Sequence, residues 1–211
     1  MAPALVHLHH CRSDMPSILQ LLDIFNKIFR QILYEIYICR SPAVLVAEEL
    51  FASGCQLLIS ITSAGQIMPV GQPPYFVLIE RALRDEGTSY HYLPPSPFSA
   101  LRPELEELLR DTWEASSVPM HSGASWTTDA PFRETEEMIQ ACRANGILAV
   151  EMEAAALYAL AQAKQSALVC FAHVTNQMAE QGDDFEKGPN QGSRAALQVI
   201  DHTARHLHYR M

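Results

Sequence analysis

The sequence predicts an α/β protein built around a largely parallel sheet. Short apolar runs alternate with segments of helical periodicity from about residue 43 onward, as in folds that place helices against parallel strands. Of the 211 residues, 48% are hydrophobic and 18% are charged, a composition that excludes a disordered chain. This length fits a single domain with a sizeable core.

Helices are expected where apolar residues recur at helical spacing and a helix terminator follows. Residues 43–53 have this spacing and stop at Gly54, a residue suited to a left-handed C-terminal cap. Residues 76–85 are interpreted in the same way, with Gly87 as the terminator. Further helices are expected at residues 103–115, 133–145, 154–164 and 193–207.

Strands are expected where a short apolar run is bounded by polar or glycine-containing segments. Residues 56–61 form such a run and lead into residues 62–65, which we interpret as a polar loop. Residues 90–97 are rich in proline and aromatic residues and predict a long loop. Further strands are expected at residues 118–125, 147–152 and 167–174.

The N-terminal region differs from the rest of the chain. We divide the sequence into an atypical N-terminal segment, residues 1–41, and one domain, residues 42–211. Apolar residues fall on one face of a helix predicted within residues 18–36. Because its polar face is not strongly basic, we expect this helix to pack on the core or a partner rather than on a membrane.

Charge and cysteine content narrow the function classes. Fifteen basic and 24 acidic residues give a net charge of −9, which argues against a nucleic-acid partner. No apolar stretch is long enough for a membrane span, and no secretory signal is evident. The five scattered cysteines predict reduced thiols and a cytoplasmic protein.

Nucleotide-binding and metal-binding patterns are weak. Neither a GxGxxG nor a GxxxxGK[ST] pattern occurs. Histidines cluster near both ends of the chain but without nearby carboxylates, so we expect no metal site. These histidines are His7, His9, His10, His202, His206 and His208.

Polar residues follow the predicted strands at four places, residues 62–65, 126–129, 150–153 and 174–177. In a parallel sheet the last three would meet at one rim and form a pocket. Simpler interpretations remain open: Ser63 as a turn residue, Trp126 as core packing, and Glu151 and Glu153 as solvated acids that begin a helix. Glu153, however, lies in a segment that reads as buried, where a ligand hydroxyl would satisfy its carboxylate.

Three segments carry a resemblance to a known family: VEMEAAALY at 150–158, WTTDAPFRET at 126–135 and TNQM at 175–178. They resemble the nucleoside phosphorylase superfamily, most closely its uridine phosphorylase-like branch, which is related to the bacterial-type purine nucleoside phosphorylases. The similarity spans roughly residues 42–200. It implies a twisted, mixed sheet that is partly closed like a barrel and flanked by helices, assembled as a homo-oligomer, either a dimer or a hexamer.

The same resemblance implies a reaction. Phosphate would cleave the N-glycosidic bond of a ribonucleoside, preferably uridine-like, to give ribose 1-phosphate and the free base. The implied partners are nucleoside and inorganic phosphate as co-substrate, with no metal and no organic cofactor.

The resemblance also implies roles for residues that contact sugar and phosphate. Glu153 would accept hydrogen bonds from the ribose hydroxyls, and Met152 would pack under the sugar. Ser63, with Gly65 beside it, would contact phosphate and ribose.

On the base side, the resemblance places Trp126 against the base with Thr127 next to it. Asn176 occupies the position of the residue that assists the leaving base. An amide hydrogen-bonds a carbonyl-bearing base but does not protonate it, which favours a pyrimidine or a 6-oxopurine. Arg133 faces the base carbonyl or loop carboxylates, or is a plain surface arginine.

Two departures from the family's pattern keep alternative functions open. Ser60 stands where a phosphate-binding arginine is usual, and residues 1–41 lack the glycine-containing phosphate loop. Arg40, or an arginine from a neighbouring subunit, would have to compensate. The alternatives are a nucleosidase that activates water through Asp129 or Glu151, and a catalytically silent or truncated homologue that binds nucleosides.

Overall fold

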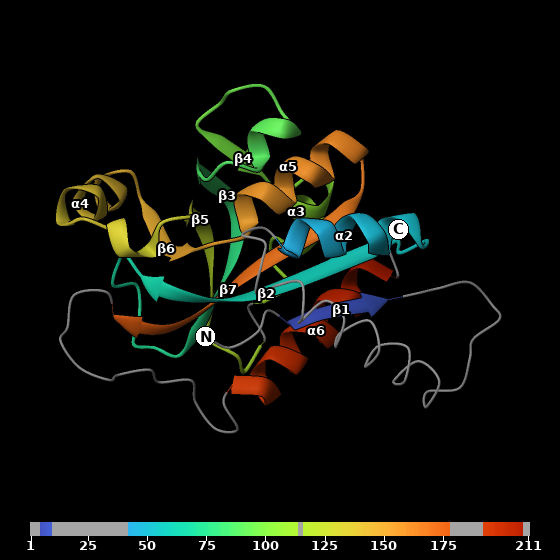
Figure 1. Ribbon diagram of the computed structural model, residues 1–211. Helices are drawn as coiled ribbons and strands as arrows, with labels where there is room; N and C mark the ends of the chain where they lie inside the picture. Colours follow the sequence, from blue (N-terminus) through green and yellow to red (C-terminus); the bar gives the residue numbers. More distant parts are fainter. Residues whose placement is uncertain (1–4, 10–41, 114–115, 178–191, 209–211) are drawn as a thin grey trace.

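The computed structural model describes residues 5–9, 42–113, 116–177 and 192–208 (Figure 1). Its strands are β1 (Leu5–His9), β2 (Leu57–Gln66), β3 (Tyr75–Asp85), β4 (Phe98–Ala100), β5 (Met120–Thr128), β6 (Ile147–Glu151) and β7 (Ala167–Gln177). Its helices are α2 (Pro42–Ala52), α3 (Pro103–Leu109), α4 (Glu136–Ala144), α5 (Ala154–Lys164) and α6 (Ser193–His208), with short 3-10 turns η1 (Ser89–His91) and η2 (Pro131–Arg133). The helix predicted within residues 18–36 lies outside the described residues.

The strand pairings form a ring. In order around it, β2 pairs with β6, β6 with β5, β5 with β3, β3 with β7, and β7 again with β2. The two longest pairings, β2 with β7 and β3 with β5, are parallel, whereas β2–β6 and β3–β7 are antiparallel. Because β2 and β6 pair only through Gly65–Val150 and Gln66–Ala149, the ring is closed at one end alone. The predicted mixed, partly barrel-like sheet is confirmed.

Helices cover this sheet from two sides. Helix α5 packs on β3, β4 and β7, and α2 packs beside α5. Helix α6 lies on the opposite side of β2 from α2 (Figure 1). Eight consecutive residues of α5, from Ala154 to Ala161, are buried, which explains why this helix lacks a polar face. None of the helices in the described ranges has the length and apolarity needed to cross a membrane.

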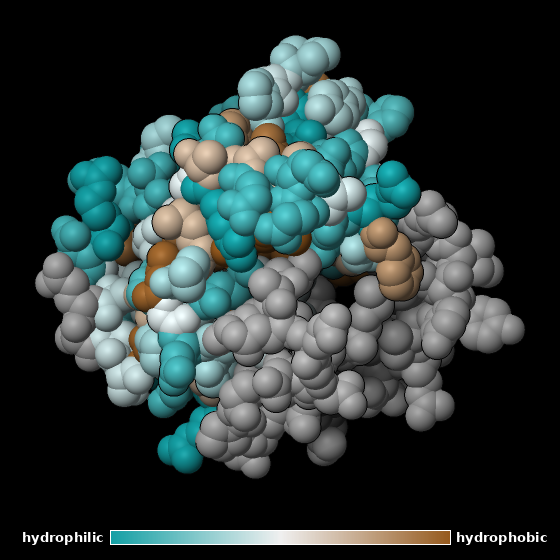
Figure 2. Space-filling view, turned by 90° about the vertical axis from the view of Figure 1, so that its left-hand side faces the viewer, coloured by the Kyte–Doolittle hydropathy of each residue, from teal (hydrophilic) through white to brown (hydrophobic). Residues whose placement is uncertain are grey.

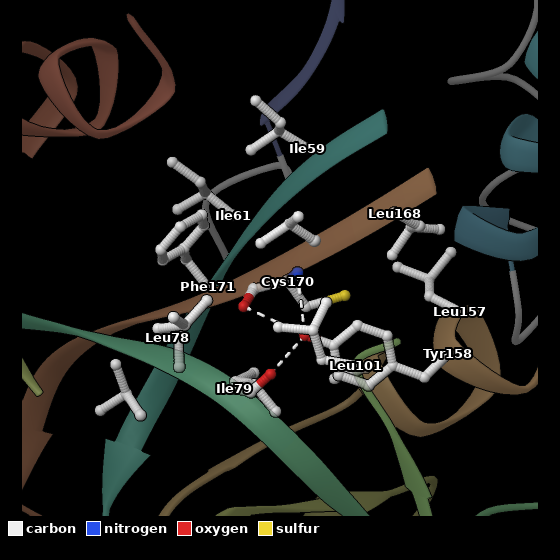
Figure 3. Close-up of a cluster of buried hydrophobic side chains, with 14 of the residues drawn as sticks. Ile59, Ile61, Leu78, Ile79, Leu101, Leu157, Tyr158, Leu168, Cys170 and Phe171 are labelled. Carbon is white, nitrogen blue, oxygen red and sulfur yellow. Dashed lines mark hydrogen bonds between the residues drawn. The ribbon is translucent and has the colours of Figure 1, made fainter. Parts of the chain in front are cut away.

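A buried tyrosine joins α5 to the sheet. The hydroxyl of Tyr158 donates a hydrogen bond to the carbonyl oxygen of Ile79 and accepts one from the amide of Cys170 at 3.1 Å (Figure 3). The β3–β7 pairing ends one residue earlier, at Leu78 and Phe171. Tyr158 therefore satisfies two backbone groups at the point where the two strands diverge.

Two predicted elements are wrong. Residues 76–85 belong to strand β3 rather than to a helix. The run from Tyr75 to Ile79 is buried and lies between the neighbouring strands β5 and β7, and its aromatic and β-branched side chains favour a strand. Residues 62–65 continue strand β2 rather than forming a loop, since their backbone pairs with β7 and β6. The other predicted strands and helices of the described ranges are present, α5 with the predicted ends and the rest with shifted ends; α3, for example, ends at Leu109.

The turn after α4 gives a stability prediction. Gly146 has φ +72°, and a Cβ added there would meet no atom within 4 Å. We expect Gly146→Ala to lower stability by about 1 kcal/mol through backbone strain alone. Gln165, at the C-terminal end of α5, has φ 56°, a left-handed conformation that glycine adopts more easily. Gln165→Gly is therefore expected to raise stability. Thermal unfolding measures both, and equal melting temperatures for Gly146→Ala and wild type would contradict this account.

Candidate functional site

Four chain segments meet at one end of the sheet. Gly65 on β2 pairs with Val150 on β6 and with Asn176 on β7. Beside them, Thr127 on β5 pairs with Glu151 on β6. The register therefore brings together the strand ends that carry the polar residues. Figure 2 views the molecule from the side toward which β2 and β7 run, and the described surface there is mostly hydrophilic.

Glu153 presents one free carboxylate oxygen at this rim. Its Oε2 accepts hydrogen bonds from the Thr62 hydroxyl at 2.5 Å and from the Met152 amide at 3.2 Å. Within the described ranges, its Oε1 accepts no hydrogen bond, and the carboxylate forms no ion pair. Burial raises the pKa of Glu153, while the bonds from Thr62 and Met152 lower it. One oxygen thus fixes the side chain, and the other is available to a hydroxyl donor.

Glu151 is buried, and both of its carboxylate oxygens accept hydrogen bonds. Its side chain is only 3% exposed. Oε1 accepts from the hydroxyls of Ser125 at 3.0 Å and Thr127 at 2.5 Å. Oε2 accepts from the backbone amides of Glu153 and Ala154, each at 2.7 Å. These amides begin helix α5 and have no partner within the helix, so Glu151 satisfies them.

The pKa of Glu151 makes a pH prediction. Burial and the neighbouring charge of Glu153 raise it from 4.5 to about 7, against the lowering effect of the hydrogen bonds. Between these two pH values the native protein therefore keeps a proton that the unfolded chain releases. Stability that is complete below pH 4.5 falls as the pH rises toward 7. We expect Glu151→Gln to flatten this fall in denaturant unfolding; an unchanged slope would contradict the assignment.

Met152 precedes Glu153 in the chain, and Ser63 follows Thr62 on β2, where successive side chains point to opposite faces. The Ser63 side chain is exposed, and its Oγ lies 3.4 Å from the Thr175 hydroxyl on β7. Met152 is half-buried between β6 and α5. Gly65 is buried within the strand pairings. These residues contribute hydroxyl, apolar and backbone groups to the strand ends near Glu153.

Two of the residues predicted to face the base, Trp126 and Thr127, have buried side chains. Trp126 is 1% exposed and Thr127 is 0% exposed. The Trp126 indole packs in an apolar cluster and donates to Asp85 Oδ2 at 2.9 Å. Both side chains pack within the sheet, and their contact with a base stays a prediction. Arg133 is exposed on η2, and for Asn176 only the backbone position, opposite Gly65, is described.

The functional groups that the sequence did not predict are side-chain hydroxyls at the same strand ends. Thr62 holds Glu153, Ser125 holds Glu151, and Thr175 approaches Ser63. Thr127 was predicted as a site residue, but its hydrogen bond to Glu151 was not. The available signal was the clustering of serine and threonine at the ends of apolar runs, where isolated polar groups need partners.

Metal ligation finds no support in the described ranges, where no group of three or more His, Cys, Asp or Glu side chains is placed to hold an ion. His202 and His206, on α6, stack on each other at 4.6 Å between ring centroids. His202 Nε2 also lies 2.7 Å from the carbonyl oxygen of Thr112. Their contacts are those of helix packing.

The fold and site define an α/β protein with a half-closed sheet and a carboxylate–hydroxyl rim. Comparison with known proteins identifies its family: a profile of the phosphorylase superfamily matches residues 39–205, and the chain belongs to that superfamily. It is also similar to a guanosine phosphorylase from Halorubrum lacusprofundi, with 30% identity over 130 residues. The match covers 60% of this chain and 52%, about half, of that protein.

Proposed function

We propose that this protein is a nucleoside phosphorylase, a pentosyltransferase that cleaves a ribonucleoside with phosphate to give ribose 1-phosphate and free base. The observation that carries the proposal is the free Oε1 of Glu153, whose carboxylate is held at the strand ends through Oε2 by Thr62 and the Met152 amide. Superfamily membership supports a phosphorylase-type function. No cofactor is part of the proposal.

The sugar is the part of the substrate that this rim suits best. A carboxylate oxygen accepts strong hydrogen bonds from hydroxyls, and Met152 offers an apolar surface next to it. As the N-glycosidic bond breaks, positive charge develops on the ribose. A carboxylate that holds the ribose hydroxyls orients the sugar and stabilises that charge.

For the base, we propose a carbonyl-bearing ring. Asn176 would donate an amide hydrogen bond to such a base rather than protonate it. Uridine and 6-oxopurine nucleosides both meet this requirement. The name of the similar guanosine phosphorylase favours including a 6-oxopurine alongside the uridine-like substrate suggested by the sequence. Arg133 remains a candidate contact for the base carbonyl.

Phosphate needs a cation that the described rim does not provide. Ser60, at the usual arginine position, is buried on β2, and no described arginine or lysine hydrogen-bonds Ser63. We propose that Arg40 or an arginine from a second copy of the chain serves the phosphate. A homo-oligomer is therefore part of this proposal, and light scattering of the purified protein tests it.

The nucleosidase alternative loses one of its two candidate bases. Glu151 is buried and accepts four hydrogen bonds, so it has no position from which to activate water. Asp129 is half-exposed, with its Oδ2 accepting from the Gly87 amide at 2.9 Å. The lack of a phosphate-binding cation at the described rim favours water as the nucleophile, whereas membership of the phosphorylase superfamily favours phosphate.

Thermal protection tests the proposed ligands. At a hundredfold excess over Kd, a bound ligand adds about 2.7 kcal/mol, which raises Tm by about 5 to 10 °C. We expect uridine or guanosine to raise Tm, and ribose 1-phosphate to raise it more than ribose or phosphate alone. A rise with nucleoside but none with ribose 1-phosphate would indicate a silent binder. No rise with any of them would contradict the proposal.

A further inference from the structure

Glu151 has no access to a ligand, yet it contacts the residue that does. We infer that Glu151 is a positioning residue, which fixes the backbone of Glu153 so that the free oxygen of Glu153 faces the ribose. The part of this inference that concerns ribose rests on the proposed function. The part that concerns the fixing of Glu153 rests on hydrogen bonds alone.

Glu151 is surrounded by hydrogen-bond donors. A buried carboxylate without a cation is tolerated only if hydrogen-bond donors replace its hydration. No described cation pairs with Glu151, and four donors surround it: two hydroxyls from β5 and the amides of Glu153 and Ala154. The carboxylate therefore ties the rim of β5 to the start of α5.

Thr127 connects Glu151 to one further backbone amide of α5. Its hydroxyl donates to Glu151 and accepts from the amide of Ala155 at 3.0 Å. Three consecutive amides, those of residues 153–155, are thus held from the β5–β6 pair. Because these amides have no partner inside α5, removal of Glu151 leaves two of them without an acceptor.

Glu153 is restrained at both its backbone and its side chain. Its backbone is held by Glu151, and its side chain is held by the Thr62 hydroxyl and its neighbour's amide through Oε2. With both restraints present, the orientation of Glu153 Oε1 is fixed. Without the bond from Glu151, the Glu153 backbone keeps the hydrogen bond that its carbonyl accepts from the Leu157 amide at 3.1 Å, the carboxylate keeps one hydroxyl and one local amide, and the free oxygen is less firmly fixed.

Glutamine is the variant that separates charge from positioning. In Glu151→Gln, the amide oxygen takes the two backbone N–H groups, and the amide nitrogen faces the two hydroxyls. Hydroxyls rotate and accept as well as donate, so Ser125 and Thr127 adapt while the backbone stays held. In Glu151→Ala, both backbone groups lose their acceptor.

The matched control is Ser99→Ala. Ser99 is buried and donates to the Ala155 carbonyl oxygen at 2.7 Å. It therefore holds the first turn of the same helix without touching Glu151 or Glu153. If Glu151→Ala does not fold, Thr127→Val removes one donor to Glu151 and the acceptor of the Ala155 amide at similar volume. It is expected to change exchange at residues 153 and 154 and the ribonucleoside preference in the same direction as Glu151→Ala but less.

The first readout needs no substrate. Amide hydrogen exchange at residues 153 and 154 is expected to accelerate by about tenfold or more in Glu151→Ala, because these two amides lose their acceptor. We expect Glu151→Gln to stay within about threefold of wild type, and Ser99→Ala likewise at the Glu153 amide. Equal exchange in Glu151→Ala and Ser99→Ala would overturn the inference, whatever the protein's activity.

The second readout uses calorimetric Kd values for guanosine or uridine and for its 2′,3′-dideoxy analogue. We expect wild type to prefer the ribonucleoside by about tenfold or more, as a site built for hydroxyls should. This preference should be lost in Glu151→Ala, retained in Glu151→Gln and Ser99→Ala, and lost in Glu153→Ala. A preference retained by Glu151→Ala would overturn the ribose part. If wild type itself shows no preference, the proposed function fails, and hydrogen exchange alone decides whether Glu151 fixes Glu153.

Discussion

Glu153→Ala is expected to lower kcat/KM for a ribonucleoside by about 10² to 10⁴, with the Kd of the 2′,3′-dideoxy analogue nearly unchanged. A hydrogen bond to a charged group contributes about 1.5 to 3 kcal/mol, and the free carboxylate oxygen is proposed to hold ribose hydroxyls. Two such bonds, lost together, give this range. Steady-state kinetics with a ribonucleoside and saturating phosphate provide the measurement.

Glu80→Ala is the matched control for this variant. Glu80, on β3, is also a half-buried carboxylate whose pKa is raised first by burial. The charged groups that influence it are Glu106, Arg81 and Arg110, none of which belongs to the rim. We expect Glu80→Ala to keep kcat/KM within about threefold of wild type. Equal losses in the two variants would show that the effect of Glu153→Ala is one of stability.

Tyr158→Phe is expected to destabilise the protein by about 2 to 4 kcal/mol. The tyrosine is fully buried, and its hydroxyl satisfies the Ile79 carbonyl and the Cys170 amide at the point where β3 and β7 separate. Each buried polar group left without a partner costs about 1 to 3 kcal/mol. Urea unfolding measures the difference.

Tyr75→Phe provides the comparison for Tyr158→Phe. Tyr75 is as deeply buried, but its hydroxyl accepts from Gln66 Nε2 at 3.0 Å, and that nitrogen also donates to the Gly71 carbonyl oxygen at 2.7 Å. Because Gln66 keeps one partner, we expect a cost of about 0.5 to 1.5 kcal/mol. If Tyr75→Phe destabilised the protein more than Tyr158→Phe, the bridging role of Tyr158 would be wrong.

The fold was predictable where local patterns agreed with tertiary burial. Helix α5 was predicted with its observed ends because a strand and a polar turn precede it and a run of alanines and leucines fills it. Strand β3 was mistaken for a helix because burial on both faces removes the alternation that marks a half-buried strand. One sequence does not show that residues 75–79 lie between two neighbouring strands of the sheet.

The candidate site was predictable at the level of segments but not of side-chain directions. The convergence of residues 62–65, 126–129, 150–153 and 174–177 follows from where strands end, and the register reproduces it. Which of two adjacent residues faces the rim depends on register and bulges, such as the shift between Ala64 and Gly65. For this reason Trp126 and Thr127 lie inside, and the supporting role of Thr62 emerged only from the structure.

Product analysis of the purified protein tests the central claim most directly. Uridine, inosine and guanosine are each incubated with and without inorganic phosphate, the released base is quantified, and ³¹P NMR follows the phosphate. We predict base release that requires phosphate, with one ribose 1-phosphate formed per base released. Release of free ribose without phosphate would contradict the account in favour of a nucleosidase, and no release from a folded protein with any of the three would contradict a phosphorylase for these nucleosides.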